Sequence, residues 1–140
     1  MTPFRLVLIT LMITALLACG KSEHDHGNDT DDHAAHPEEG PNGAPLIEVG
    51  DHLAHLEFIH DEDAGTIILN ALGVDGVTPL ALDAPPELKI SGIDSSFVMV
   101  GNASGTSFTV TDEQLKMHGP EGRITVKLNG RAYNPELLHD

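Results

Sequence analysis

Histidines and acidic side chains gather in one short stretch near the start of the chain. Between Gly20 and Pro45 there are seven acidic residues and four histidines, which are His24, His26, His33 and His36. Imidazole nitrogens bind zinc and copper, and carboxylates add oxygen ligands and attract cations. This stretch is therefore a candidate site for a divalent transition metal. The alternative is a solvated spacer whose histidines are incidental.

A second candidate lies in segment 52–60, whose alternation of apolar and polar residues is typical of a β-strand. Side chains two positions apart share a face, so we expect His55 and Glu57 to be about 6.5–7 Å apart. One cation could bind both, with His60, His118 or an N-terminal histidine as a third ligand. The alternative is that the two are exposed residues that make a cross-strand hydrogen bond.

Catalytic chemistry is not expected from the remaining residues. A nucleophile needs a base and an orienting group, and the serines lie in loops or near strand ends without a nucleophile-elbow sequence. The segment from Gly101 to Gly105 lacks the Lys-Ser/Thr of a phosphate loop, and the acids from Asp61 to Asp63 lack the spaced ligands of a calcium loop. We therefore expect a protein that is not an enzyme.

The overall charge narrows the choice of partners. Asp and Glu number 22 against 7 Lys and Arg, so the formal net charge is −15 at pH 7. Nucleic-acid binding requires a basic face that neutralises phosphates. We expect no nucleic-acid partner.

The N-terminal segment has the features of an export signal. Arg5 precedes an apolar run from Leu6 to Leu17, which is shorter than the ~20 residues that span a bilayer. Leu16-Leu17-Ala18-Cys19, which contains the chain's one cysteine, resembles the lipobox of bacterial lipoproteins. The resemblance implies a signal peptide over residues 1–18 and a mature protein that is held in a membrane by acyl groups, such as palmitate, on Cys19.

The same resemblance implies a location in the cell envelope, outside the cytoplasm. Gly20 and Lys21 follow the cysteine, in place of the Asp that retains lipoproteins in the inner membrane in Gram-negative sorting systems. This favours the outer membrane and the periplasm. An ordinary signal peptide cut after Ala18 and an uncleaved anchor are the alternatives.

The rest of the chain divides into a linker and one folded domain. Residues 19–45 contain no large apolar residue, which predicts a disordered linker that spans roughly 25–30 Å. Residues 46–140 show short β-rich runs separated by turns, which predicts a small antiparallel β-sandwich, Ig-like or related. We expect strands at Leu46–Val49, 52–60, Thr66–Leu72, Leu80–Leu82, Leu88–Ile90, Phe97–Val100, Ser107–Val110, Arg123–Leu128 and Arg131–Tyr133.

Three local signals refine this prediction. Asn129-Gly130 is the preferred pair for a two-residue hairpin turn. Ala84-Pro85-Pro86 is expected to interrupt the strands, because proline cannot donate a backbone hydrogen bond. Thr111 to His118 is the one candidate helix, stopped by Gly119-Pro120.

Two parts of the sequence resemble a known domain. Gly40-Pro41-Asn42-Gly43-Ala44-Pro45, with the later His55-Leu56-Glu57 and His60-Asp61, is similar to the opening of a small domain found in planctomycete-type lipoproteins and in the N-terminal part of some heavy-metal efflux adaptor subunits. The segment from Val126 to Tyr133 resembles its closing hairpin. Asn42 stands where the family has His, and Ala44 where it has Gly.

The resemblance implies a β-sandwich outside the cytoplasm. It supports the fold and the compartment more than a metal site, because Asn42 replaces the family's histidine. The linker histidines and the His55/Glu57 pair favour binding of zinc or copper, as a buffer or as a feeder to an envelope metal efflux system. The alternative is an adhesion or assembly module whose exposed sheet edge or loops bind another envelope protein without metal.

Overall fold

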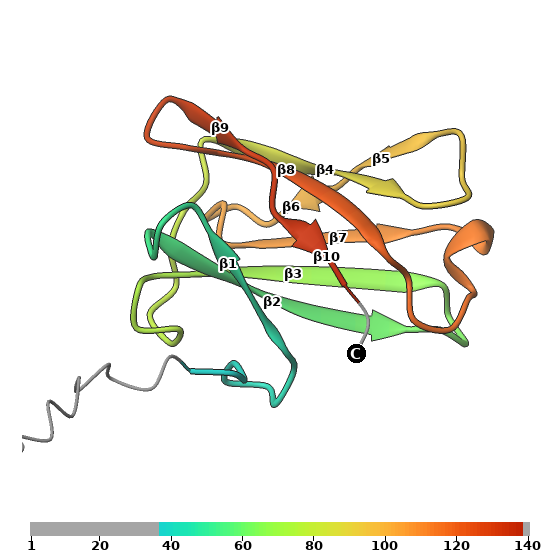
Figure 1. Ribbon diagram of the computed structural model, residues 1–140, viewed down its shortest axis with the longest axis horizontal. Coiled ribbons are helices and arrows are strands. Elements are labelled where there is room, and N and C mark those ends of the chain that lie inside the picture. The colour runs from blue at the N-terminus through green and yellow to red at the C-terminus, as the bar shows by residue number, and fades with distance from the viewer. Residues whose placement is uncertain (1–36, 139–140) are drawn as a thin grey trace, which may run out of the picture. The chain divides into compact units, whose positions relative to one another are not determined.

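Alternating apolar residues fold the chain into two stacked antiparallel sheets in the computed structural model, which describes residues 37–138 (Figure 1). The predicted β-sandwich is confirmed. The first sheet has the strand order β1 (Leu46–Val49), β2 (Ala54–Asp61), β3 (Thr66–Leu72), β7 (Ser107–Thr111) and β6 (Val100–Gly101). The second has the order β10 (Glu136–Leu137), β8 (Gly122–Leu128), β4 (Ala84–Ile90) and β5 (Ser96–Val98), with β9 (Arg131–Tyr133) also paired to β8.

The core between the sheets is aliphatic, as expected for a chain without tryptophan. Leu56, Ile67, Leu69, Leu88 and Ile124 are each fully buried there. Burial of such a side chain stabilises the fold by about 1.5–3 kcal/mol. The buried residues that the structure describes all belong to one compact unit, His33–Asp140, so that unit contains its own core.

The region around β4 differs from the prediction. Leu80–Leu82 is a loop, fixed by the Leu82 N–H donating to the Gly105 carbonyl at 2.9 Å. Ala84-Pro85-Pro86 does not interrupt the sheet but begins β4, and the register against β8 shifts between Ala84 and Glu87. This irregularity accommodates two residues that have no N–H to donate.

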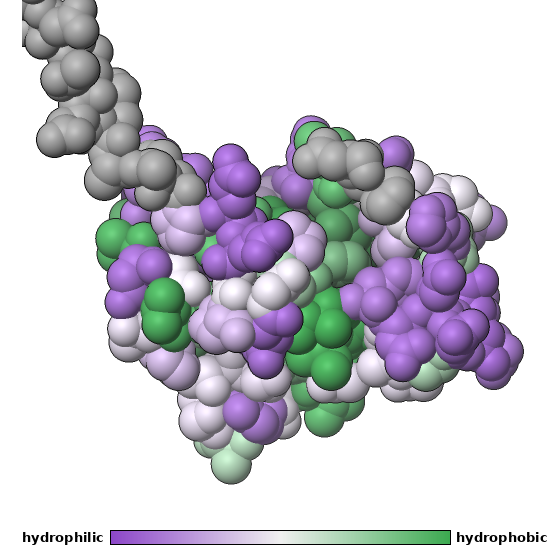
Figure 2. Space-filling model, turned by 90° about the horizontal axis from the view of Figure 1, so that it is seen from below, coloured by the Kyte–Doolittle hydropathy of each residue, from purple (hydrophilic) through white to green (hydrophobic). Residues whose placement is uncertain are grey.

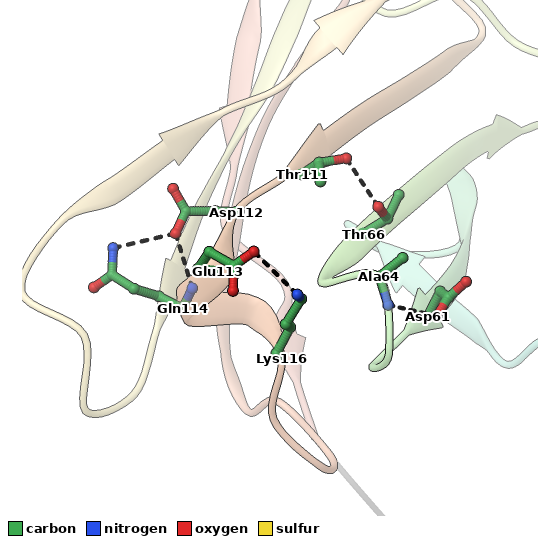
Figure 3. Close-up of polar contacts among 8 residues, drawn as sticks. All are labelled: Asp61, Ala64, Thr66, Thr111, Asp112, Glu113, Gln114 and Lys116. Carbon is green, nitrogen blue, oxygen red and sulfur yellow. Dashed lines mark hydrogen bonds and ion pairs between the residues drawn. The ribbon is translucent and has the colours of Figure 1, made fainter.

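The predicted helix is a single 3₁₀ turn, η1 (Glu113–Leu115). Strand β7 continues through Thr111, whose hydroxyl is 2.8 Å from that of Thr66 on β3, so the first residue of the predicted helix belongs to the sheet (Figure 3). The Asp112 carboxylate caps the turn by accepting from the Gln114 N–H at 2.9 Å.

The closing hairpin follows the prediction. Asn129 and Gly130 connect β8 to β9 with φ of 53° and 75°, the two positive values that a tight hairpin turn of this kind requires. Strand β10 was not expected from the sequence. It is only two residues long and pairs with the start of β8.

The folded domain begins before Leu46. The N-terminal loop, residues 37–45, is ordered against the first sheet: Leu46 N–H donates to the Glu38 carbonyl at 3.0 Å, and Gly40 N–H to the Ala44 carbonyl at 2.8 Å. The prediction of a disordered linker up to residue 45 is therefore wrong from residue 37, because hydrogen bonds rather than apolar burial hold this loop.

The signal peptide, Cys19 and residues 19–36 of the predicted linker lie outside the described residues, as do His24, His26, His33 and His36. Within residues 37–138, no helix has the length and apolar character needed to cross a membrane.

Candidate functional site

The predicted pair on β2 lies on the outer face of the first sheet. Alternate residues of β2, among them Leu56, face the core, and His55 and Glu57 point the other way. Both are nevertheless buried, His55 with 3% and Glu57 with 0% of its surface exposed. The alternative prediction is therefore wrong about exposure, because loops cover this face. Its cross-strand hydrogen bond is confirmed for Glu57, which accepts from the side chain of Asn70 on β3 at 3.0 Å.

Glu57 is held by a network of amide groups. Its Oε1 accepts from the Asn42 backbone N–H at 2.6 Å, and its Oε2 accepts from the side-chain amides of Asn42 at 2.7 Å and Asn70 at 3.0 Å. Ser107 donates to Asn70 Oδ1 at 2.8 Å and extends the network across the sheet. The Asn42 contacts tie the N-terminal loop to β2.

This network keeps Glu57 ionised. Burial by itself would raise the pKa of the carboxyl group, but hydrogen bonds from Asn70, Asn42 and the Ala44 backbone outweigh burial and lower the pKa below its ordinary value. A carboxylate offers about four acceptor positions, and protein donors already fill them. A metal ion would have to displace one of these donors.

Gly40 permits the close approach of the N-terminal loop. A Cβ at this position would lie 2.6 Å from Cδ and from Oε1 of Glu57, which is closer than carbon atoms can pack. Only glycine allows the loop to cross the carboxylate at this distance.

His55 fixes a second loop. Its Nδ1–H donates to the Gly73 carbonyl at 3.1 Å, where the chain leaves β3. Asp75 organises the same loop by accepting from the Thr78 hydroxyl at 2.6 Å and from the Thr78 and Val77 N–H groups at 2.9 and 3.0 Å, and these bonds lower the pKa of Asp75 to about 2. His55 and Glu57 thus hold two loops on one face.

The other predicted ligands do not join this pair. His60 lies on the core side of β2, half-buried, and its Nε2–H donates to the Leu115 carbonyl at 2.8 Å. His118 is exposed, and its Nδ1–H contacts Glu62 Oε2 at 3.0 Å. Within residues 37–138, the structure brings no third ligand to His55 and Glu57.

A different group of potential ligands occurs at the turn from β1 to β2. Glu48, Asp51 and His52 each place a ligand atom within 4.8 Å of the others, and no other group of three among residues 37–138 meets this condition. His52 Nδ1 lies 3.2 Å from Glu48 Oε1, and the His52 N–H donates to the same oxygen at 2.9 Å. All three side chains are exposed.

The sequence contained a signal for this group. Glu48, Asp51 and His52 surround Gly50, a typical turn residue, but the alternation over segment 52–60 predicts a strand from its first residue. The structure places His52 in the turn with φ of 54°, and β2 starts at Ala54. This conformation directs the imidazole back toward Glu48.

Comparison with known proteins gives no relative: no family model, curated protein or solved structure matches the chain. A function for this protein is therefore inferred from its own residues.

Proposed function

We propose that this protein is a lipid-anchored lipoprotein of the bacterial cell envelope that binds a divalent transition metal, zinc or copper. The observation that carries the proposal is the convergence of Glu48, Asp51 and His52 at the turn from β1 to β2. One imidazole and two carboxylates form a ligand set that suits these ions. The linker histidines supply further imidazoles from the same polypeptide.

The exposure of the three side chains favours a site that exchanges its metal ion with other molecules over a site that holds the ion permanently. A structural zinc site encloses the ion with four protein ligands, whereas three exposed ligands leave positions for water or for a ligand from another chain. The sandwich has its own apolar core, so its folding does not need the metal. These features fit a buffer or a feeder to a metal efflux system.

The net charge of −15 supports the same proposal. A protein of this charge raises the local concentration of cations at its surface, an effect that weakens with salt. Residues Glu48 and Asp51 add two carboxylates at the site itself.

Calorimetric titration with zinc and with copper tests the proposal. We would compare two forms of the chain. The form beginning at Gly20 has the linker histidines. The form beginning at Pro37 lacks these histidines but keeps the Asn42 contacts. We expect both to bind, and His52→Ala to remove the binding shown by the shorter form. His118→Ala is the matched control, because His118 is also exposed and also contacts a glutamate.

Two results would contradict parts of the proposal. Absence of binding tighter than about 10 μM in every form would exclude a metal function. Binding by the form beginning at Gly20 but not by the form beginning at Pro37 would show that only the linker histidines bind the metal. Affinity should also fall as the pH is lowered from 7 to 5, because imidazole binds metal only in its neutral form.

The membrane anchor is tested separately. We expect Cys19→Ala to abolish incorporation of labelled fatty acid and to leave the precursor uncleaved. Normal cleavage of this variant would argue for an ordinary signal peptide.

One observation favours a second function, an interaction module. β5 and β6 are edge strands of the two sheets, and Val98 and Val100 beside this edge are 67% and 75% exposed. Exposed edges can pair with a strand of another protein. Under this alternative, Val98→Lys would remove a crosslink to an envelope protein without changing metal affinity.

A further inference from the structure

The sandwich is open along the side opposite to the β5–β6 edge. There, β1 is the last strand of the first sheet, and β10 and β9 pair with successive parts of β8 in the second. A groove of about 810 Å³ lies between β1 and β10. Ile47 of β1, Phe58 of β2 and Leu137 of β10 line it. The groove thus leads from the surface to residues that pack against the core.

The lining of the groove is mainly apolar. Figure 2 shows hydrophobic residues gathered in a band between hydrophilic flanks on the face seen from below. The apolar residues of the groove include Leu46, Ile47, Phe58, Leu137 and Leu138, of which Leu138 is 71% exposed. Exposed apolar surface bordered by polar residues is typical of binding sites.

The charged groups of the groove have one sign. Glu48, Glu62 and Glu136 line it together with His60 and His118, and no lysine or arginine does. Arg123, outside the groove, contacts Glu136 Oε1 at 3.2 Å, which leaves Glu48 and Glu62 as the carboxylates without an arginine or lysine partner among the ion pairs of residues 37–138. Charge complementarity therefore favours an occupant with cationic groups beside an apolar part.

The neighbouring strand edge favours an extended occupant. The Leu46 N–H is occupied by the Glu38 carbonyl, but no strand among residues 37–138 pairs with the outer edge of β1 from Ile47 to Val49. An extended peptide can add to such an edge through its backbone and place alternate side chains in a pocket.

We propose that this groove binds an extended segment of a partner protein in which apolar residues alternate with lysine or arginine. The apolar side chains fill the space over Ile47, Phe58 and Leu137, and the basic side chains meet the carboxylates of the rim. The interaction requires neither the metal nor the β5–β6 edge.

Nuclear magnetic resonance titration with a peptide tests the proposal. The ¹⁵N-labelled chain begins at Gly20 and so retains the whole compact unit, and EDTA is present so that no metal is bound. The probe is acetyl-Lys-Val-Lys-Val-Lys-Val-amide. We expect shifts at Ile47, Phe58 and Leu137 with a Kd below about 1 mM. Leu138→Ser should weaken binding about fivefold, and Val98→Ser, an equally exposed control outside the groove, should not.

Each of the following outcomes would overturn the proposal. Equal binding of acetyl-Lys-Ser-Lys-Ser-Lys-Ser-amide would show attraction by charge alone, and equal binding of hexylamine would indicate a pocket for small amphiphiles. Shifts centred on Val98 and Val100 would move the docking site to the opposite edge. No shift at 1 mM peptide would mean that the groove does not bind such segments.

Discussion

Asn42 donates two hydrogen bonds to Glu57, one from its backbone N–H at 2.6 Å and one from its side-chain amide at 2.7 Å. These bonds join a loop at the start of the domain to a buried position of strand β2. They explain why residues 37–45 are ordered although they bury little apolar surface. The loop and the carboxylate form one structural unit.

Replacement of Asn42 should therefore destabilise the domain. We expect Asn42→Ala to lower the free energy of unfolding by about 1–3 kcal/mol, because it leaves a buried charged acceptor partly unsatisfied. Denaturant unfolding measures this change. Asn134→Ala, which removes one exposed hydrogen bond from Thr125, is the control and should cost less than about 1 kcal/mol. Equal effects of the two variants would contradict a special role for Asn42.

The charge of Glu57 should make stability depend on pH. Because the pKa of Glu57 is lower in the folded state, its charge stabilises the fold fully above the ordinary carboxyl pKa of 4.5, and this contribution is lost as pH falls through the folded-state value. The stability difference between the wild type and Glu57→Gln should thus be constant from pH 7 to 5.5 and shrink below pH 4.5. Unfolding curves at several pH values measure it.

Asp75, whose pKa is about 2, is present in both the wild type and Glu57→Gln. Its titration therefore cancels in the difference between their unfolding free energies. A difference that grows on acidification would contradict the account, since it would mean that the folded state favours the protonated carboxyl group of Glu57.

Gly40 and Gly73 offer a matched test of the close approach at Glu57. A Cβ at Gly40 would be 2.6 Å from the Glu57 carboxyl carbon, whereas the nearest atom to a Cβ at Gly73 is 3.4 Å away, and neither glycine has a left-handed φ. We expect Gly40→Ala to lower the thermal unfolding temperature by several degrees, through a loss of about 1–3 kcal/mol. Gly73→Ala should change it little. An unchanged unfolding temperature in Gly40→Ala would show that the N-terminal loop can move away from Glu57 without loss of stability.

Local signals in the sequence were sufficient for much of the fold. The Asn129-Gly130 pair and the alternation of Ile124, Val126 and Leu128 predicted the closing hairpin, because both depend on neighbouring residues alone. The start of β4 was missed because tolerance of Pro85 and Pro86 depends on the irregular pairing of β4 with β8, which is not a local property.

The candidate site was predicted less well. The alternation correctly placed His55 and Glu57 on one face, but two loops distant in sequence cover that face, and their contacts with Asn42 and Gly73 could not be read from the spacing. The alternation of apolar and polar residues extends through His52 and therefore predicts a strand there. The positive φ of His52 instead directs it toward Glu48.

Paramagnetic broadening by Cu²⁺ reports where on the folded domain the metal binds. In the chain beginning at Pro37, substoichiometric Cu²⁺ should first broaden the amide signals of Glu48, Asp51 and His52, and His52→Ala should remove this selectivity. Broadening that begins instead at His55, or at His118 and Glu62, would contradict the proposed site.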